Sequence, residues 1–259
     1  MFSKGTESIE AYLKIFEALW YTGQATREGL NRARQLADEA IILDPKFPTA
    51  YFVLGIVHMM EALTGFSKNP AESNELCNHM LHKAIELDGS FGIARASLGY
   101  NLAMLKRYDE AISEVERAYE LAPNNGQVLF FYGTVLFTIG RYEEALRPLR
   151  EALRIDPIPP NSRFRTLGCT LGWGLQIYDE AISYMRRAVQ REPNDILSQV
   201  ILTSLYSMAS RDEEARTTAK EVLRINPKFS ADRYITAIAV KDAAARDRIA
   251  QALKKAGLK

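Results

Sequence analysis

The stretch that decides the fold is SFGIARASLGYNLAMLKRYDEAISEVERAYELAP, from Ser90 to Pro123. It is followed directly by NNGQVLFFYGTVLFTIGRYEEALRPLREALRIDP, from Asn124 to Pro157. Similar endings, each closed by a proline or a glycine, recur along the chain at Pro45, Gly89, Pro123, Pro157, Pro193 and Pro227. A chain that repeats one pattern six times is expected to repeat one structural unit.

Each unit predicts two helices. In the second stretch, apolar residues recur at intervals of three and four over 129–137 and again over 142–152, which is typical of amphipathic helices. Gly140 separates the two runs. The closing proline ends the second helix because it lacks an N–H and clashes with the preceding turn. Gly133 and Ala145 are small enough to let the two helices approach closely.

This pattern resembles the tetratricopeptide repeat. The family's Leu-Gly pair in the first helix, followed by Tyr, Ala, an apolar residue, Ala and Pro, is carried here by Leu98-Gly99, Tyr108, Ala111, Val115, Ala118 and Pro123. The resemblance implies an all-α, right-handed superhelical solenoid of about six helix-turn-helix hairpins plus a C-terminal capping helix pair. It implies one domain over 1–259, with repeats near 8–45, 46–89, 90–123, 124–157, 158–193 and 194–227 and a cap at 228–259. The function is not implied by the fold.

A second, weaker resemblance concerns the arrangement of the repeats. The stretched second repeat with TGFSKNPAES, the insertion Ile158-Pro159-Pro160 and the ending RINPKFSADRY are similar to the C-terminal repeat region of bacterial class III adenylate/guanylate cyclases. This resemblance implies an interaction module of a larger bacterial signalling protein, either an excised segment or a stand-alone relative. Asn69-Pro70-Ala71-Glu72 predicts that the second helix of the stretched repeat starts near Pro70.

Composition argues against several classes of partner. Lys plus Arg is 33 and Asp plus Glu is 32, so the net charge of +1 provides no global attraction to nucleic acid. The longest nearly apolar run, 128–139, is too short for a membrane span. The first ten residues lack an apolar signal core, and two cysteines do not make a disulfide framework. We therefore expect a cytoplasmic protein with no nucleic-acid partner and no membrane span.

The sequence predicts neither a cofactor nor an enzyme. His79 and His82 share a helix face near Cys77, but a metal site needs three or four converging ligands, so surface or packing roles are favoured. Cys169 has no local base that would make it a nucleophile. Gly172-Trp173-Gly174 is interpreted as a turn between helices and not as a phosphate-binding loop. The acidic pairs at 109–110, 143–144, 179–180 and 213–214 are expected in the first turn of the second helices, where the positive end of the helix dipole favours negative charge.

In tetratricopeptide repeats the first helix of each hairpin lines a concave groove, and this resemblance implies a peptide-binding site. The matching positions here are mostly apolar and aromatic, namely Phe52, Ile56, Met60, Tyr100, Met104, Phe130, Thr134, Phe137, Arg165, Cys169 and Trp173. Methionine and aromatic residues suit an adaptable hydrophobic groove. Some of these side chains could instead form the core between repeats. Only Arg165 carries charge, so a clamp for a C-terminal carboxylate is not expected.

Three functional hypotheses follow. The leading one is a non-catalytic scaffold that holds a hydrophobic or amphipathic segment of a protein or peptide partner in the groove. The second is a regulatory or oligomerising module of a larger signalling enzyme. The third is self-association, in which the groove or an end helix of one chain meets another chain. Residues 241–259 carry six basic and two acidic side chains, which predicts a solvated cap or a basic docking patch.

Overall fold

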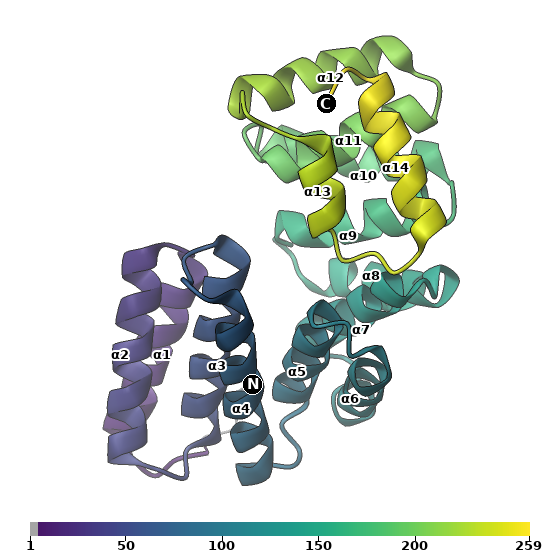
Figure 1. Cartoon of the computed structure of the whole chain (residues 1–259). Helices are drawn as coiled ribbons and strands as arrows, with labels where there is room; N and C mark the ends of the chain where they lie inside the picture. The colour runs from purple at the N-terminus through teal and green to yellow at the C-terminus, as the bar shows by residue number, and fades with distance from the viewer. Residues whose placement is uncertain (1–4) are drawn as a thin grey trace. The chain divides into compact units, whose positions relative to one another are not determined.

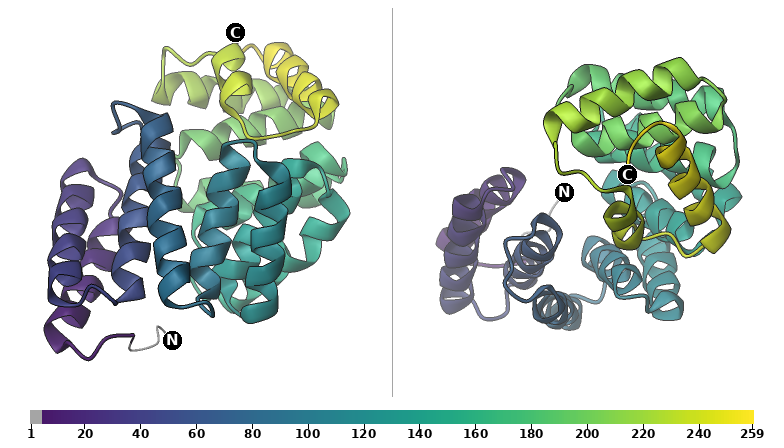
Figure 2. Two further views of the ribbon diagram at one scale, coloured as in Figure 1. Left: turned by 60° about the horizontal axis from the view of Figure 1, so that its bottom comes forward. Right: turned by 45° about the horizontal axis from the view of Figure 1, so that its top comes forward.

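The computed structural model describes residues 5–259, which contain fourteen α-helices and one short π-helix, with no strands in this range. The helices follow one another as antiparallel pairs (Figures 1 and 2). Two compact units divide the chain, Met1–Pro123 and Asn124–Lys259. Each unit is an all-α stack of the predicted hairpins and is described by itself.

The first unit contains three hairpins. Their helices are α1 (Ile9–Gly23) with α2 (Arg27–Leu43), α3 (Pro48–Thr64) with α4 (Pro70–Leu87), and α5 (Gly92–Met104) with α6 (Tyr108–Leu121). Neighbouring hairpins pack through α2 on α3 and α4 on α5. The helices α3 and α5 therefore lie between their own second helix and the second helix of the preceding hairpin.

The second unit contains three more hairpins and the C-terminal helix pair. The hairpins are α7 (Gly126–Ile139) with α8 (Tyr142–Ile155), α9 (Asn161–Cys169) with α10 (Tyr178–Arg191), and α11 (Ile196–Met208) with α12 (Asp212–Ile225). The predicted C-terminal pair is present as α13 (Ala231–Ala237) and α14 (Ala243–Lys255). The predicted start of α4 is also confirmed, because the side chain of Asn69 accepts a hydrogen bond from the Glu72 N–H.

Small residues set the spacing within the hairpins. A Cβ atom at Gly99 would lie 2.8 Å from the carbonyl oxygen of Ala111 and 2.6 Å from a methyl group of Val115. A Cβ atom at Gly133 would lie 2.5 Å from the Cγ of Leu149. All three distances are shorter than atoms in contact can adopt, so the close packing of first and second helices depends on glycine at these positions.

The acidic pairs lie in the first turn of the second helices, as predicted. In three hairpins the second acid also pairs with an arginine that precedes the helix, as in Arg107–Glu110 at 2.6 Å and Arg211–Glu214 at 2.5 Å. The hydrogen bond from its arginine holds the pKa of Glu110 and of Glu214 below the ordinary value. These carboxylates serve helix starts on the exposed surface.

The interpretation of Gly172-Trp173-Gly174 as a turn is wrong. These residues belong to a π-helix, η1 (Thr170–Gly174), that continues α9, and the turn follows at 175–177. Close packing explains the two glycines, because a Cβ at Gly172 would lie 2.1 Å from Leu205 and a Cβ at Gly174 would lie 2.4 Å from the ring of Tyr142. The wider π-turn carries one extra residue before the chain reverses.

Candidate binding faces

The eleven predicted groove residues fall into two sets, one in each unit. We call Phe52, Ile56, Met60, Tyr100 and Met104 the first face, and Phe130, Thr134, Phe137, Arg165, Cys169 and Trp173 the second face. The first face is carried by α3 and α5, and the second face by α7, α9 and η1. Each set is therefore examined within its own unit.

On the first face, four of the five side chains are half-buried, those of Ile56, Met60, Tyr100 and Met104. Phe52 is only 4% exposed and packs on the ring of Phe91, with the ring centroids 5.3 Å apart. Phe52 therefore belongs to the core between α3 and the start of α5. The other four leave part of an apolar face accessible on α3 and α5.

On the second face, four of the six side chains are buried, those of Thr134, Phe137, Cys169 and Trp173. The Trp173 indole N–H donates to the Ser204 hydroxyl of α11 at 2.9 Å. Arg165 is half-buried and donates to the Asp195 carboxylate at 2.5 Å, so its charge is already paired. Phe130 is half-buried beside Phe131 and the Arg163 guanidinium. This set is thus mostly closed to a partner.

The C-terminal helix pair closes the second face. In Figure 1, α13 and α14 lie against the second unit beside α9 and α11. The helix α14 packs on α11 and reaches η1, and it does not continue the stack along α12. As a result ten consecutive residues of α11, 198–207, are buried on every side of the helix. In a stack of hairpins, the second helix of its own hairpin and the neighbouring hairpin cover only part of a first helix. Burial on every side therefore requires that a further segment covers the remaining side.

Three hydrogen bonds fasten the C-terminal segment to the second unit. Arg248 donates to the carbonyl oxygen of Trp173 at 3.0 Å, and the Lys241 N–H donates to the carbonyl oxygen of Thr138 at 2.9 Å. The Tyr142 hydroxyl donates to the Asp242 carboxylate at 3.3 Å. Burial, together with the charge of Asp242, raises the pKa of Tyr142 to about 12, so the donor stays protonated at neutral pH. The segment is therefore held at residues from α7, α8 and η1.

Most of the basic side chains near the C-terminus have partners in the same unit. Lys254 pairs with Asp232 at 3.0 Å and Lys255 pairs with Asp212 at 2.8 Å. Arg246 donates to the carbonyl oxygen of Val240 at 2.6 Å. These contacts favour a structural role for the basic ending over a docking patch. The sequence signal for the fold-back was present in its buried apolar residues, Val240, Ile249, Leu253 and Leu258, which a fully solvated cap would not need.

The groups considered for chemistry are placed in packing positions. Cys77 and Cys169 are buried, and burial raises the pKa of both thiols, to about 12 for Cys77. A thiol of this kind is a poor nucleophile because the reactive form is the thiolate. Over residues 5–259, no group of three or more His, Cys, Asp and Glu side chains is arranged to hold a metal ion. Within the same range, no helix combines the length and apolar character needed to cross a bilayer.

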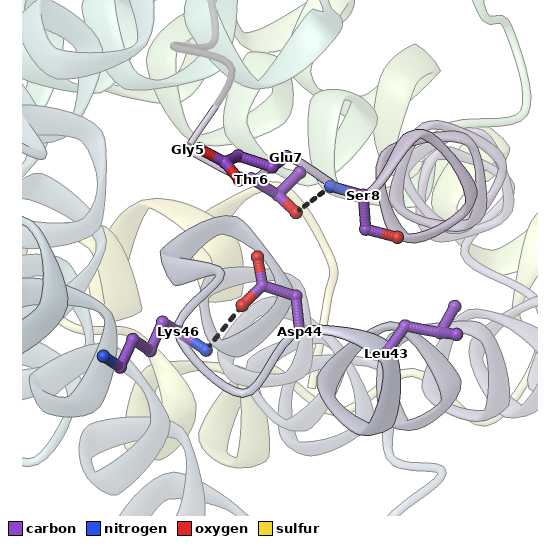
Figure 3. Close-up of a pocket in the computed structure, with 7 residues that line it drawn as sticks. All are labelled: Gly5, Thr6, Glu7, Ser8, Leu43, Asp44 and Lys46. Atoms are coloured by element: carbon purple, nitrogen blue, oxygen red, sulfur yellow. Dashed lines mark hydrogen bonds between the residues drawn. The ribbon is translucent and has the colours of Figure 1, made fainter.

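A hollow of about 670 Å³ lies near the start of the first unit and is lined by residues 5–8 together with Leu43, Asp44 and Lys46 (Figure 3). Two of its polar side chains, those of Thr6 and Asp44, are engaged in local turns. The Thr6 hydroxyl accepts from the Ser8 N–H at 3.0 Å, and the Asp44 carboxylate accepts from the Lys46 N–H at 3.0 Å. These two groups are therefore occupied by the backbone of their own segments.

Comparison with known proteins agrees with this fold. Residues 92–157, which cover α5 to α8, match the family model of the tetratricopeptide repeat. Human protein O-mannosyl-transferase TMTC3 is 29% identical over 83% of this chain and 23% of its own length. Transcriptional regulator HilA of Salmonella typhimurium is 24% identical over 83% of this chain and 38% of its own length. Human tetratricopeptide repeat protein 7B is 26% identical over 75% of this chain and 24% of its own length. The chain thus spans about a quarter to two fifths of these relatives.

Two solved structures are similar over most of their length. YrrB, whose structure is that of a TPR protein with an unusual peptide-binding site, has a TM-score of 0.51 and 20% identity, with 74% of this chain and 93% of YrrB covered. PilF of Pseudomonas aeruginosa has a TM-score of 0.62 and 20% identity, with 85% of this chain and 93% of PilF covered. At such identity the likeness concerns the fold alone. The predicted all-α solenoid of helix hairpins is confirmed, the tetratricopeptide repeat itself is matched over residues 92–157, and the resemblance to cyclases stays a prediction.

Proposed function

We propose that this chain is a non-catalytic protein-binding scaffold that holds a hydrophobic or amphipathic segment of a partner protein on its first helices. Protein–protein interaction is the general role of tetratricopeptide repeats, and the accessible apolar part of the first face is the site proposed for the partner. The single observation that carries the proposal is the packing of α14 on α11. An amphipathic helix of the chain already lies on a first helix, so this type of surface accepts a helix.

The two faces then have different roles in the proposal. The second face is occupied by the chain's own C-terminal segment, through Arg248, Asp242 and the backbone of Lys241. The first face keeps Ile56, Met60 and Met104 half-buried on α3 and α5. Methionine side chains adapt their shape to different apolar partners, which suits a face that receives a guest helix. We therefore place the partner's segment on the first face.

The experiment uses the full chain as bait in a lysate of the source organism, followed by mass spectrometry. The variant Met60→Glu with Met104→Glu puts two charges on the first face and is expected to lose the protein that the unaltered chain captures. The matched control is Leu76→Glu, which alters an exposed apolar residue on α4, a second helix of the same unit. Circular dichroism checks that both variants keep their helical signal.

Three results would overturn the proposal. The first is capture of the same proteins by the double variant and by the unaltered chain. The second is equal loss of the captured proteins in Leu76→Glu, because a nonspecific surface effect would then explain both variants. The third is the absence of any protein captured reproducibly by the unaltered chain at close to equimolar amounts.

A second candidate function is a repeat module of a larger regulatory protein. The observation in its favour is that this chain spans only 38% of the transcriptional regulator HilA and 23% of TMTC3, so similar repeat regions occur as parts of longer chains. The predicted resemblance to cyclases belongs to this candidate. The genomic reading frame tests it, with a catalytic or DNA-binding domain expected in the same or a neighbouring frame. A frame without such a domain would count against it.

A further inference from the structure

The first helix of the chain carries an exposed apolar stripe. On α1, the side chains of Ile9, Leu13, Phe16 and Trp20 are 77%, 59%, 68% and 65% exposed. Their spacing of four, three and four residues places them along one side of the helix, as in the seam of a coiled coil. The opposite side of α1 carries the buried residues, Ala11, Ile15, Ala18 and Thr22. The stripe is thus a continuous apolar face with no cover from the described residues.

The internal hairpins show what covers the corresponding side of a first helix. In α5, Gly99 contacts α6, its own second helix. Asn101, two residues further on, donates to the carbonyl oxygen of Asn74 and to the side chain of Asn78, both on α4 of the preceding hairpin and both at 2.9 Å. In α1, the buried Ala18 takes the place of Gly99, and Trp20, two residues further on, takes the place of Asn101. The stripe therefore lies on the side that receives a helix in the internal repeats.

We propose that the stripe binds the same stripe of a second copy of this chain, so that two α1 helices pair in antiparallel orientation about a two-fold axis. The spacing of the four residues reads the same in both directions, as such an axis requires. Antiparallel pairing sets Phe16 of one copy against Leu13 of the other, and Trp20 against Ile9. Each large aromatic residue then meets a smaller aliphatic one, whereas parallel pairing would set Trp20 against Trp20.

Charge and area are consistent with this occupant. Glu10 and Glu17 flank the stripe, and each is within 4 Å of a cation of its own chain, Lys14 at 3.7 Å and Arg32 at 3.5 Å. The carboxylates at the edges are therefore partly neutralised before a second copy approaches. The exposed parts of the four side chains amount to roughly 500 Å² per copy, if a large side chain contributes about 150–250 Å². Two copies would bury roughly 1,000 Å², which is the lower limit for a specific interface and predicts a weak dimer.

The last hairpin argues against head-to-tail filaments of the chain. A filament would need to seat the apolar stripe on α12, the second helix of that hairpin. The exposed positions of α12 are mostly charged or polar, including Glu213, Arg216, Thr217, Lys220 and Arg224. Burying these groups against Phe16 and Trp20 would be unfavourable. A closed dimer through two stripes is the arrangement that pairs apolar with apolar surface.

The test is the mass of the full chain by sedimentation equilibrium over a wide range of concentrations. The unaltered chain is expected to rise from the monomer mass toward twice that mass, while Leu13→Glu with Phe16→Glu stays monomeric throughout. The control is Ile158→Glu, which alters an isoleucine that is 76% exposed outside the stripe and should dimerise as the unaltered chain does. Because all three positions are exposed, the variants are expected to keep their fold, which circular dichroism verifies.

Cross-linking tests the orientation. Cys77 and Cys169 are buried, so introduced cysteines report the contact without removal of the native thiols. A mixture of Leu13→Cys and Phe16→Cys chains is expected to form mixed disulfide dimers several-fold faster than either variant forms dimers with itself. Faster self-linkage of Leu13→Cys would overturn the antiparallel arrangement. The proposal itself would be overturned by a monomer at every concentration, or by a dimer that still forms in the variant Leu13→Glu with Phe16→Glu. The stripe would then be a contact surface for another helix or for a membrane.

Discussion

At the scale of the residue, Gly99 decides how closely α5 and α6 can pack. A Cβ atom at this position would meet the Ala111 carbonyl oxygen at 2.8 Å, and a backbone atom inside a helix moves at much greater cost than the end of a flexible side chain. Gly99→Ala is therefore expected to lower the free energy of unfolding by about 2 kcal/mol, measured by urea denaturation. Gly89→Ala is the control, because nothing lies within 4 Å of a Cβ there. Equal losses in the two variants would contradict the packing argument.

His58 provides a residue-scale prediction about pH. Burial and the charge of Arg34 lower the pKa of His58 below 6.5, against the opposing effects of Glu61 and Asp38. The unfolded chain then binds this proton more readily, so the histidine contributes stability that is complete above about pH 6.5 and is lost as the pH falls. We expect the free energy of unfolding to fall by less than about 1.4 kcal/mol per pH unit in this range.

His58→Gln should flatten this decline, whereas the exposed His79→Gln should leave it unchanged. The measurement is urea denaturation of the three proteins at several values between pH 7 and pH 5. An identical slope in the unaltered chain and in His58→Gln would show that other groups cause the decline.

At the scale of the element, the C-terminal segment is held on the second face by a few polar contacts and by the packing of α14 on α11. Arg248→Ala removes the hydrogen bond to the Trp173 carbonyl and is expected to raise amide hydrogen exchange in α13 and α14 about tenfold, since bonds from charged donors contribute about 1.5 kcal/mol or more. In a Trp20→Phe background, the emission of Trp173 is also expected to shift to the red as its cover loosens. The exposed Arg233→Ala is the control in the same segment. Unchanged exchange in α13 and α14 would mean that apolar packing alone holds the segment.

At the scale of the whole molecule, repeat proteins differ from globular ones because each hairpin contacts mainly its neighbours. A local loss of packing should therefore have a local effect. In Gly99→Ala, amide hydrogen exchange followed by mass spectrometry is expected to rise most in α5 and α6 and to change little in α11 and α12. A uniform rise along the chain would instead indicate that both units unfold as one cooperative system.

The hairpins, their glycines and the acidic first turns could all be predicted without a structure. Each depends on contacts within about 34 residues, so the spacing of apolar and small side chains carries the information, as Gly99 and Val115 illustrate. The resemblance to tetratricopeptide repeats also placed Phe52 and Phe137 on the first helices. It could not distinguish an accessible side chain from a buried one, because that depends on which other segment covers it.

The position of residues 228–259 depended on long-range packing. Their amphipathic pattern predicted two helices but fits either the end of the stack or the side of a first helix. The segment lies on the side of a first helix because α14 packs on α11. Hydrogen bonds to Thr138, Tyr142 and Trp173, which are distant in the sequence, hold it there. The local sequence pattern thus specified the helices. Which apolar faces are occupied and which remain accessible depends on how the helices bury one another, and this is decided only in the folded chain.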